Sequence, residues 1–301
     1  MKRTVLALLC AALILVSCGC ANYAFEQTGG YIVSPQEALS LAQSGAVLLD
    51  VRPASDYAAG HIAGAINIPM NALTVSEPYE NTLAGADQVA SVMGAAGVTE
   101  TDALLIYDGS ANMQAARVQW TLNMYNNFNA KVVSGGFDKL AGLKGTIVET
   151  SATVLPAATY SAGDKQKKLI VNIEYIKMLL DTPEENTIIL DARTAAEFKE
   201  GTIPGSVNID YVWNNYPSGE YKSPMDLQST YLNKGVLPEM KIIVFCKSGV
   251  RAAQTYTALK DAGYQDVRVY DGSWTEFVDV MGASAAAPSE GPVGPSSGDA
   301  S

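Results

Sequence analysis

The sequence predicts an α/β protein of two tandem domains, each a mainly parallel sheet flanked by helices. Segments 49–68 and 190–209 are identical at nine of twenty positions, at a constant offset of 141 residues. A period of that length suits a repeated domain rather than the short unit of a solenoid. In both copies, short runs rich in Val, Ile and Leu alternate with helix-like stretches. This alternation is typical of a parallel sheet covered by helices.

The elements of the two copies are expected in the same order along the chain. The first copy is placed at 31–150, with strands at 47–51, 103–107 and 131–133 and a long helix at 112–125. The second copy is placed at 168–281, with strands at 187–192, 207–209, 241–245 and 267–270 and helices at 172–180, 224–233 and 249–262. Between them, 151–167 contains Pro156 and Gly163 without apolar periodicity, which predicts a linker.

The two ends of the chain are predicted to lie outside the domains. Residues 1–17 place Lys2 and Arg3 before an apolar run that is too short to span a bilayer, which indicates a signal peptide. The segment ending at Cys18 resembles the lipobox of bacterial lipoproteins, so we expect Cys18 to be lipidated; the alternative is an ordinary secretory signal. Residues 18–30 would be a tether, and 282–301, rich in Gly, Ser, Pro and Ala, a disordered tail. The expected location is extracytoplasmic, with the lipid anchored in a bacterial membrane.

Composition narrows the classes of function. The chain is 48% hydrophobic and 17% charged, as expected of folded domains with real cores. Its formal net charge of −11 argues against a basic surface for phosphate backbones, so we expect no nucleic-acid partner. Any anionic ligand must be held by local groups.

The cysteines draw attention to one position. Cys10 lies in the predicted signal peptide, Cys18 and Cys20 lie at the anchor, and only Cys246 falls within the predicted domains. No disulfide framework is therefore possible, and a lone thiol in an oxidising compartment is a liability unless it is buried or usefully reactive. One Cys and one His (His61) in separate copies cannot form a metal site, and we expect neither a metal nor a cofactor.

Cys246 ends a predicted buried strand and precedes a predicted helix. Backbone N–H groups of such a loop point inward, and the helix N-terminus adds partial positive charge, so the loop would stabilise a nucleophilic thiolate. Lys247 and Arg251 add two cations that favour the thiolate and could hold an anionic substrate. The alternative is an inert thiol buried in a strand.

Taken together, these segments resemble the tandem-domain rhodanese family of thiosulfate and 3-mercaptopyruvate sulfurtransferases. The motifs that carry the resemblance lie at 50–52, 60–65, 191–193, 201–206, 246–251 and 270–274. The resemblance implies that the second domain is catalytic. In the first domain, Asp108 stands where the second has Cys246, and it is expected in a polar network at the domain interface.

The resemblance also implies a mechanism. Cys246 would take sulfur from a donor as a persulfide, and cyanide or a thiol would then remove it. The loop formed by Lys247, Ser248, Gly249, Val250 and Arg251 would stabilise the persulfide and bind substrate. Arg193 and Lys247 are candidates for the donor's anionic end, although Arg193 could instead pair structurally with a strand Asp.

The donor is predicted to be thiosulfate. The loop Cys-Lys-Ser-Gly-Val-Arg mixes features of both branches of the family, and Lys247 favours an inorganic dianion over mercaptopyruvate. Thr202 replaces a His common in the family's motif, whereas the first copy keeps His61, for which we expect a structural or capping role.

Two other functions compete with sulfur transfer. Phosphatases and arsenate reductases of related fold use Cys-x5-Arg, whereas Cys246 to Arg251 is Cys-x4-Arg, a spacing that disfavours phosphatase activity. The second alternative is a lipid-anchored sulfur carrier or binding module that hands its persulfide to a protein partner.

Overall fold

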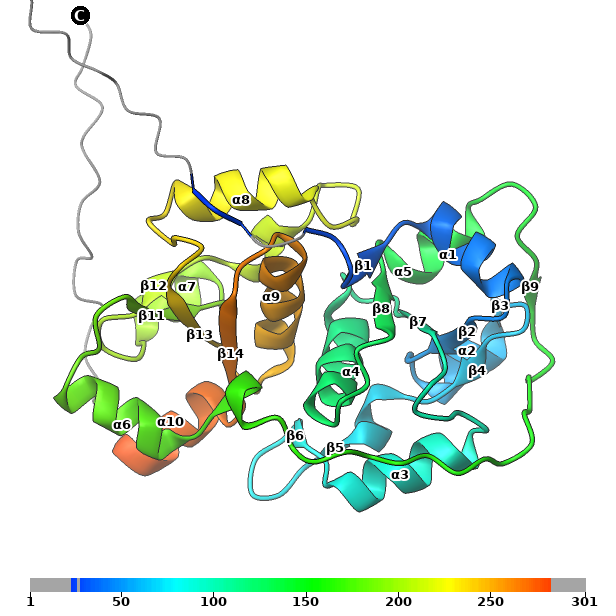
Figure 1. Ribbon diagram of the computed structural model, residues 1–301, viewed down its shortest axis with the longest axis horizontal. Helices are drawn as coiled ribbons and strands as arrows, with labels where there is room; N and C mark the ends of the chain where they lie inside the picture. Colours follow the sequence, from blue (N-terminus) through cyan, green and yellow to red (C-terminus); the bar gives the residue numbers. More distant parts are fainter. Residues whose placement is uncertain (1–22, 26–27, 283–301) are drawn as a thin grey trace, which may run out of the picture.

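The computed structural model describes residues 23–25 and 28–282. The predicted signal peptide, the lipidation site Cys18 and the tail from 283 onward lie outside the described residues. Within them, two α/β domains lie side by side (Figure 1). The predicted fold class is confirmed. No helix among the described residues is long and apolar enough to cross a membrane.

The two domains contain the same five-stranded parallel sheet. The first has strand order β1-β8-β7-β2-β4 and the second β10-β14-β13-β11-β12. In the first domain these strands are β1 (Ile32–Val33), β2 (Val47–Asp50), β4 (Ile66–Asn67), β7 (Leu104–Tyr107) and β8 (Ala130–Val133). In the second they are β10 (Ile170–Val171), β11 (Thr187–Asp191), β12 (Val207–Asn208), β13 (Lys241–Phe245) and β14 (Asp266–Tyr270).

Helices cover both sheets, and several begin with a side-chain cap that the local sequence supplies. Ser34 and Ser223 each accept a backbone N–H and precede a proline at the first helical turn. The helices of the first domain are α1 (Pro35–Gln43), α2 (Ala54–Ala59), α3 (Ala86–Ala95), α4 (Met113–Met124) and α5 (Gly136–Ala141). Those of the second are α6 (Ile173–Asp181), α7 (Ala195–Glu200), α8 (Pro224–Leu232), α9 (Val250–Asp261) and α10 (Ser273–Met281).

Short elements complete the fold. The 3-10 helices are η1 (Met70–Leu73), η2 (Lys167–Leu169) and η3 (Tyr211–Asn214). Two antiparallel pairs join β3 (His61–Ile62) to β9 (Val148–Glu149) and β5 (Thr74–Val75) to β6 (Thr82–Leu83). We call residues 74–83 the covering hairpin. The sequence did not predict it, because strands of two residues carry no periodic signal.

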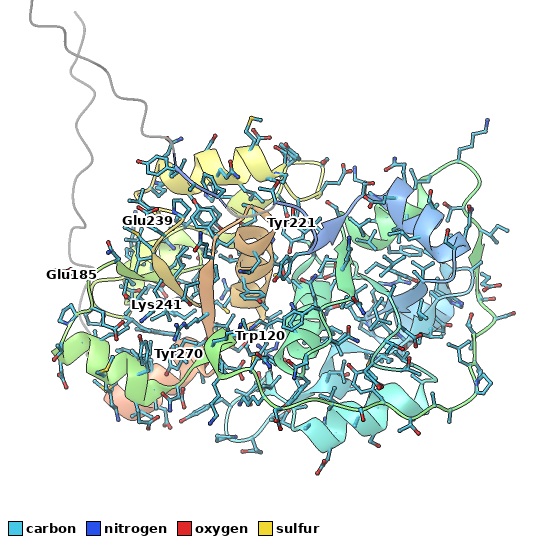
Figure 2. All side chains as sticks on the ribbon, in the orientation of Figure 1. Trp120, Glu185, Tyr221, Glu239, Lys241 and Tyr270 are labelled. Carbon is cyan, nitrogen blue, oxygen red and sulfur yellow. The ribbon has the colours of Figure 1, made fainter. Side chains whose placement is uncertain are left out.

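The domains meet along α4 and α9, which pack side by side in the middle of the molecule (Figure 1). Thr257 on α9 donates a buried hydrogen bond of 2.7 Å to Gln119 Oε1 on α4. Trp120 and Tyr221 are buried where the domains meet (Figure 2). The interface is therefore a continuous core rather than a loose contact between two independent domains.

The segment between the domains runs along the first domain without helix or strand from 150 to 166. Ala158 donates its N–H to Gly94 O at 2.9 Å, and Gly163 donates to Tyr125 O at 3.1 Å. A Cβ at Gly94 would lie 2.7 Å from Ala158 O, so the close approach of this segment to α3 requires glycine.

Candidate active site

Cys246 lies at the carboxyl end of β13, a central strand of the second sheet, and is 1% exposed. Its N–H donates to Ser273 Oγ at 3.2 Å, and its carbonyl accepts the N–H of Trp274 at 3.0 Å. Both partners belong to the first turn of α10. The start of α10, which belongs to the motif at 270–274, therefore holds the backbone of Cys246 in place.

We call residues 246–251 the reactive loop. Gly249 is the last residue before α9 and has a φ of +82°. A Cβ at this position would lie 2.9 Å from Arg117 Nη1 and 3.0 Å from Asp271 O. Both the left-handed backbone and the space available therefore require glycine at this turn. The turn aims the N-terminus of α9 into the loop.

The corresponding loop of the first domain, residues 108–112, is one residue longer before its helix and carries Asp108 in place of the cysteine. Asp108 follows β7 as Cys246 follows β13, and its carboxylate is buried. Oδ1 accepts the N–H groups of Ser110 and Asn112 at 3.0 and 3.1 Å. Oδ2 accepts those of Gln114 and Ala115 at 2.7 and 3.0 Å. Four backbone donors converge on one anion, which is the arrangement of an anion nest.

The charge of Asp108 is balanced between two opposing effects. Burial raises the pKa of its carboxyl group, and the four backbone donors lower that pKa without fully offsetting the burial. In the second domain, the N–H groups of 247–251 find no acceptor among the described residues. The two loops differ, therefore, in whether the protein supplies the anion.

Arg251 is engaged in a bidentate ion pair with Glu197. Its Nη1 and Nη2 lie 2.7 and 2.8 Å from the two carboxylate oxygens. The pair lowers the pKa of Glu197 to about 2 and raises that of Arg251, on which the charge of Cys246 also acts. Glu197 and Thr194 form the capping box of α7. Arg251 thus clamps the start of α9 to the start of α7 while its charge lies close to the thiol.

Arg193 forms a buried pair with Asp191. Its Nε lies 3.0 Å from Oδ1 and its Nη2 lies 2.6 Å from Oδ2, and Nη2 also donates to Gly201 O at 2.6 Å. Thr202 Oγ1 donates to the same carboxylate at 2.8 Å. The sequence left two roles open for Arg193, binding the donor or pairing with a strand Asp. These contacts are the ones expected of the second, structural role.

The first domain repeats this arrangement without a cysteine. Arg52 Nε and Nη2 contact Asp50 at 3.0 and 2.6 Å, and Nη2 donates to Gly60 O at 2.7 Å. Because the domain without the thiol has the same Arg–Asp contact, we infer that this contact stabilises the fold in both domains. Among the predicted donor-binding cations, Lys247 is exposed and forms no ion pair within the described part of the chain.

His61 lies in the first domain, buried against Tyr57. The two rings stack with centroids 3.6 Å apart, and Nδ1 lies 2.9 Å from Tyr57 O. Its other ring nitrogen lies 3.9 Å from Glu149 on β9. These contacts tie α2 to the start of the segment between the domains and suit the structural role expected from the sequence.

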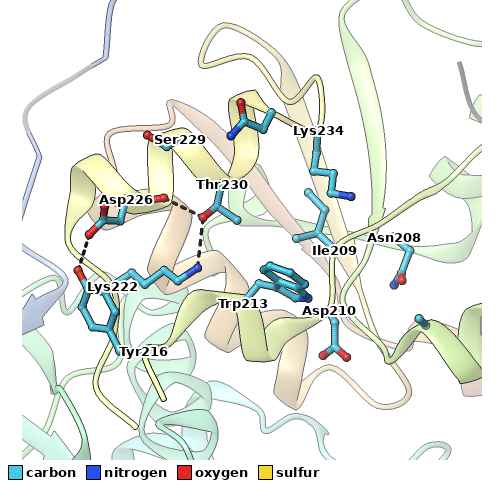
Figure 3. A pocket seen from close by; sticks show the side chains of 12 residues that line it. Asn208, Ile209, Asp210, Trp213, Tyr216, Lys222, Asp226, Ser229, Thr230 and Lys234 are labelled. Carbon is cyan, nitrogen blue, oxygen red and sulfur yellow. Dashed lines mark hydrogen bonds between the residues drawn. The ribbon is translucent and has the colours of Figure 1, made fainter. Parts of the chain in front are cut away.

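A cavity of about 630 Å³ borders the second domain between η3 and α8 (Figure 3). Lys222, Trp213 and Lys234 line it, and the Lys222 ammonium lies 5.6 Å from the centre of the Trp213 ring. Neither Cys246 nor any other residue of the reactive loop belongs to its lining. The chemistry is therefore assigned to the loop and not to this cavity.

Comparison with known proteins agrees with the geometry. The rhodanese-like domain family matches residues 34–142 and 173–279, which together make up most of the chain. The chain belongs to the rhodanese family. This rhodanese is a sulfurtransferase, as its relatives are named. Some of those relatives are named for thiosulfate and others for 3-mercaptopyruvate, so the comparison leaves the sulfur donor open.

The relatives carry both activity names. The 3-mercaptopyruvate sulfurtransferase of Escherichia coli K12 is 30% identical over 242 residues, covering 76% of this chain and 84% of the relative. A putative thiosulfate sulfurtransferase of Mycobacterium leprae is 29% identical over 242 residues, covering 76% and 86%. The crystal structure of a 3-mercaptopyruvate sulfurtransferase from Escherichia coli superposes with a TM-score of 0.73 at 27% identity, covering 82% of this chain and 99% of that one.

Proposed function

We propose that this rhodanese transfers sulfane sulfur from thiosulfate to cyanide or a thiol through a persulfide on Cys246. The observation that carries the proposal is the pair of matching loops. In the first domain four backbone N–H groups hold the carboxylate of Asp108, and in the second a loop of four residues rather than five carries Cys246 between its strand and its helix. A loop built to hold an anion suits first a thiolate and then a persulfide.

The first step is an attack of the Cys246 thiolate on the outer sulfur of thiosulfate. A new S–S bond forms, the S–S bond of thiosulfate breaks, and sulfite leaves with the electron pair of that bond. The product is a persulfide anion on Cys246. The loop N–H groups stabilise the negative charge on the terminal sulfur, and no proton needs to move.

The second step returns the enzyme to its starting state. Cyanide attacks the terminal sulfur, the Cys–S bond to that sulfur breaks, and its electron pair stays on Cys246 as a thiolate. Thiocyanate leaves, and a thiol acceptor would instead leave as its own persulfide. The single histidine, His61, lies in the first domain, so neither step uses a histidine base: the Cys246 thiolate is the nucleophile of the first step and the leaving group of the second.

Lys247 is the residue we propose to bind the anionic end of the donor. It is exposed beside Cys246, whereas Arg251 and Arg193 already pair with carboxylates. An ammonium without a carboxylate partner is available to attract a dianion such as thiosulfate. Mercaptopyruvate, with one carboxylate, would gain less from it.

Mass spectrometry of the intact protein tests the proposal. After incubation with thiosulfate the protein should gain one sulfur atom, which cyanide should remove, and the Cys246→Ser variant should gain none. A parallel incubation with mercaptopyruvate compares the donors. If neither donor adds sulfur, the small-donor enzyme is ruled out, and a carrier loaded by a protein partner becomes the better account.

We also propose that Cys18 anchors the protein to a bacterial membrane through lipid, outside the cytoplasm. The support comes from the sequence before Cys18 alone. Expression in a bacterial host and fractionation should place the protein in membranes, and Cys18→Ser should release it or block its processing. An unprocessed or membrane-free parent protein would contradict the anchor.

A further inference from the structure

The first domain reaches across the interface to the reactive loop of the second. Asn81, on the covering hairpin, donates its side-chain N–H to Ser248 Oγ at 3.2 Å. Leu83 of the same hairpin donates its backbone N–H to Asp271 Oδ2 at 2.8 Å. Tyr79 adds a hydrogen bond of 2.8 Å to Asp279 on α10. The loop that carries Cys246 is thus partly built by residues of the other domain.

Arg117 on α4 is the centre of these contacts. Its side chain is fully buried, and Nη2 lies 2.6 Å from Asn81 O and 2.7 Å from Asp271 Oδ1. Its Nη1 packs against Gly249, where even a methyl group would clash. One guanidinium therefore touches the covering hairpin, the segment that leads into α10, and the left-handed turn of the reactive loop.

The contacts of Arg117 also come at a cost in stability. Its Nε and Nη1 are buried and find no hydrogen-bond acceptor among the described residues. Unsatisfied donors on a buried charge destabilise a fold, so packing alone does not account for an arginine here.

The loop around Asp108 in the first domain has neutral residues at the positions that correspond to Arg117 and Asp271. By position along α9, Gln254 matches Arg117, and by position after β8, Ser134 matches Asp271. Tyr221 donates its N–H to Ser134 Oγ at 2.8 Å, as Leu83 does to Asp271. Neutral Gln254 and Ser134 therefore stand at the positions that correspond to Arg117 and Asp271, whose ion pair lies beside the loop that carries the thiol.

We infer that Arg117 is a positioning residue for sulfur transfer, supplied by the domain that has no catalytic cysteine. Its ion pair with Asp271 and its bond to Asn81 O fix the turn at Gly249. The fixed turn keeps the N–H groups of the reactive loop directed at the sulfur of Cys246. The first domain then contributes directly to the chemistry, and the inference rests on the proposed persulfide role of Cys246.

A double substitution tests this inference. Arg117→Gln with Asp271→Ser copies the neutral residues at the corresponding positions, Gln254 and Ser134, so no unpaired carboxylate is left in the core. In the purified protein we expect the kcat for sulfur transfer from thiosulfate to cyanide to fall at least about tenfold, with a much smaller change in KM. The rate of Cys246 alkylation by iodoacetamide at pH 7 should fall as well, relative to the rate at pH 9.5.

The matched control is Gln254→Ala with Ser134→Ala. It removes buried hydrogen bonds of the same interface on the side of the Asp108 loop, and should leave kcat and alkylation within about twofold of the parent. Thermal unfolding of both variants compares their stability. A folded Arg117 variant that alkylates and turns over at the parental rate would overturn the inference.

Two further outcomes are distinguished by the design. If the double variant does not fold, Arg117→Lys decides, because a lysine keeps the charge but lacks the second guanidinium nitrogen that packs against Gly249; parental alkylation and kcat would again overturn the inference. If the parent protein transfers no sulfur, the proposed function fails, and the alkylation rates alone decide whether Arg117 orders the loop.

Discussion

The two domains have the same sheet order and the same buried Asp–Arg pair, yet they differ in the residue that begins the loop after the central strand. Asp50 with Arg52 and Asp191 with Arg193 make nearly superimposable contacts. After β7 the chain places Asp108, and after β13 it places Cys246. The comparison separates what maintains the fold, present in both copies, from what supports chemistry, present in one.

The difference also shows how one scaffold can hold either a permanent or a transferable anion. Asp108 brings its own carboxylate to four backbone donors and keeps it there. A thiolate in the same kind of loop can take up a sulfur atom and release it. The first domain is therefore a built-in reference for the second.

The largest expected effect is on the thiol itself. Cys246→Ser should reduce sulfur transfer by at least about 10³-fold, because a serine hydroxyl at this site cannot form a persulfide. Thermal unfolding should change little. Measurable turnover in this variant would show that another group carries the sulfur.

The buried Asp–Arg pairs should contribute equally to the stability of the two domains. Arg52→Met and Arg193→Met should each lower the free energy of unfolding by about 3–5 kcal/mol, because each leaves a buried carboxylate without its partner. Urea unfolding measures both. If Arg193→Met instead raised KM for thiosulfate at nearly unchanged stability, Arg193 would be a donor-binding residue and the symmetry of the two pairs would be misleading.

A smaller effect is expected at the inert loop. Asp108→Asn should lower the free energy of unfolding by about 1–3 kcal/mol, because two of the four backbone donors lose their carboxylate acceptor. Sulfur loading of Cys246, followed by mass spectrometry, should be unchanged. A loss of loading without loss of stability would mean that the Asp108 loop takes part in the reaction.

The smallest expected effect is the contribution of the Glu197–Arg251 ion pair to the free energy of unfolding. Arg251 lowers the folded-state pKa of Glu197 to about 2, below its ordinary value of 4.5, whereas Gln114 stands at the position of Arg251 in the first domain. The pair therefore stabilises the fold fully above pH 4.5 and loses this contribution as the pH falls toward 2.

Because Glu197 is partly exposed, its contribution should amount to about 1 kcal/mol. Unfolding of the parent and of Glu197→Gln, compared between pH 6 and pH 3, measures it. The stability difference between the two proteins should shrink on acidification, and a constant difference would contradict the role of the ion pair.

Much of this comparison could be predicted from the sequence, because its signals are local. Buried parallel strands are continuous apolar runs, and the predicted strands at 47–51, 187–192 and 241–245 lie within one residue of the observed ones. The turn into α9 was likewise visible, since a cysteine, a glycine and a helix pattern follow one another directly.

What the sequence could not provide depends on contacts between distant segments. Arg117 lies in a predicted helix with nothing to mark it, and its partners Asn81 and Asp271 come from other elements. Glu197 and Arg251 are likewise joined only by the fold. Such pairs leave no periodic or spacing signal, so a single sequence cannot reveal them.

A crystal structure of the persulfide form, prepared with thiosulfate, would test the central claim most directly. With the two domains superposed, the terminal sulfur on Cys246 should lie within hydrogen-bond distance of the N–H groups of 248–251, where the first domain places the carboxylate of Asp108. A terminal sulfur directed away from those groups would show that the two loops do not share an anion-holding role.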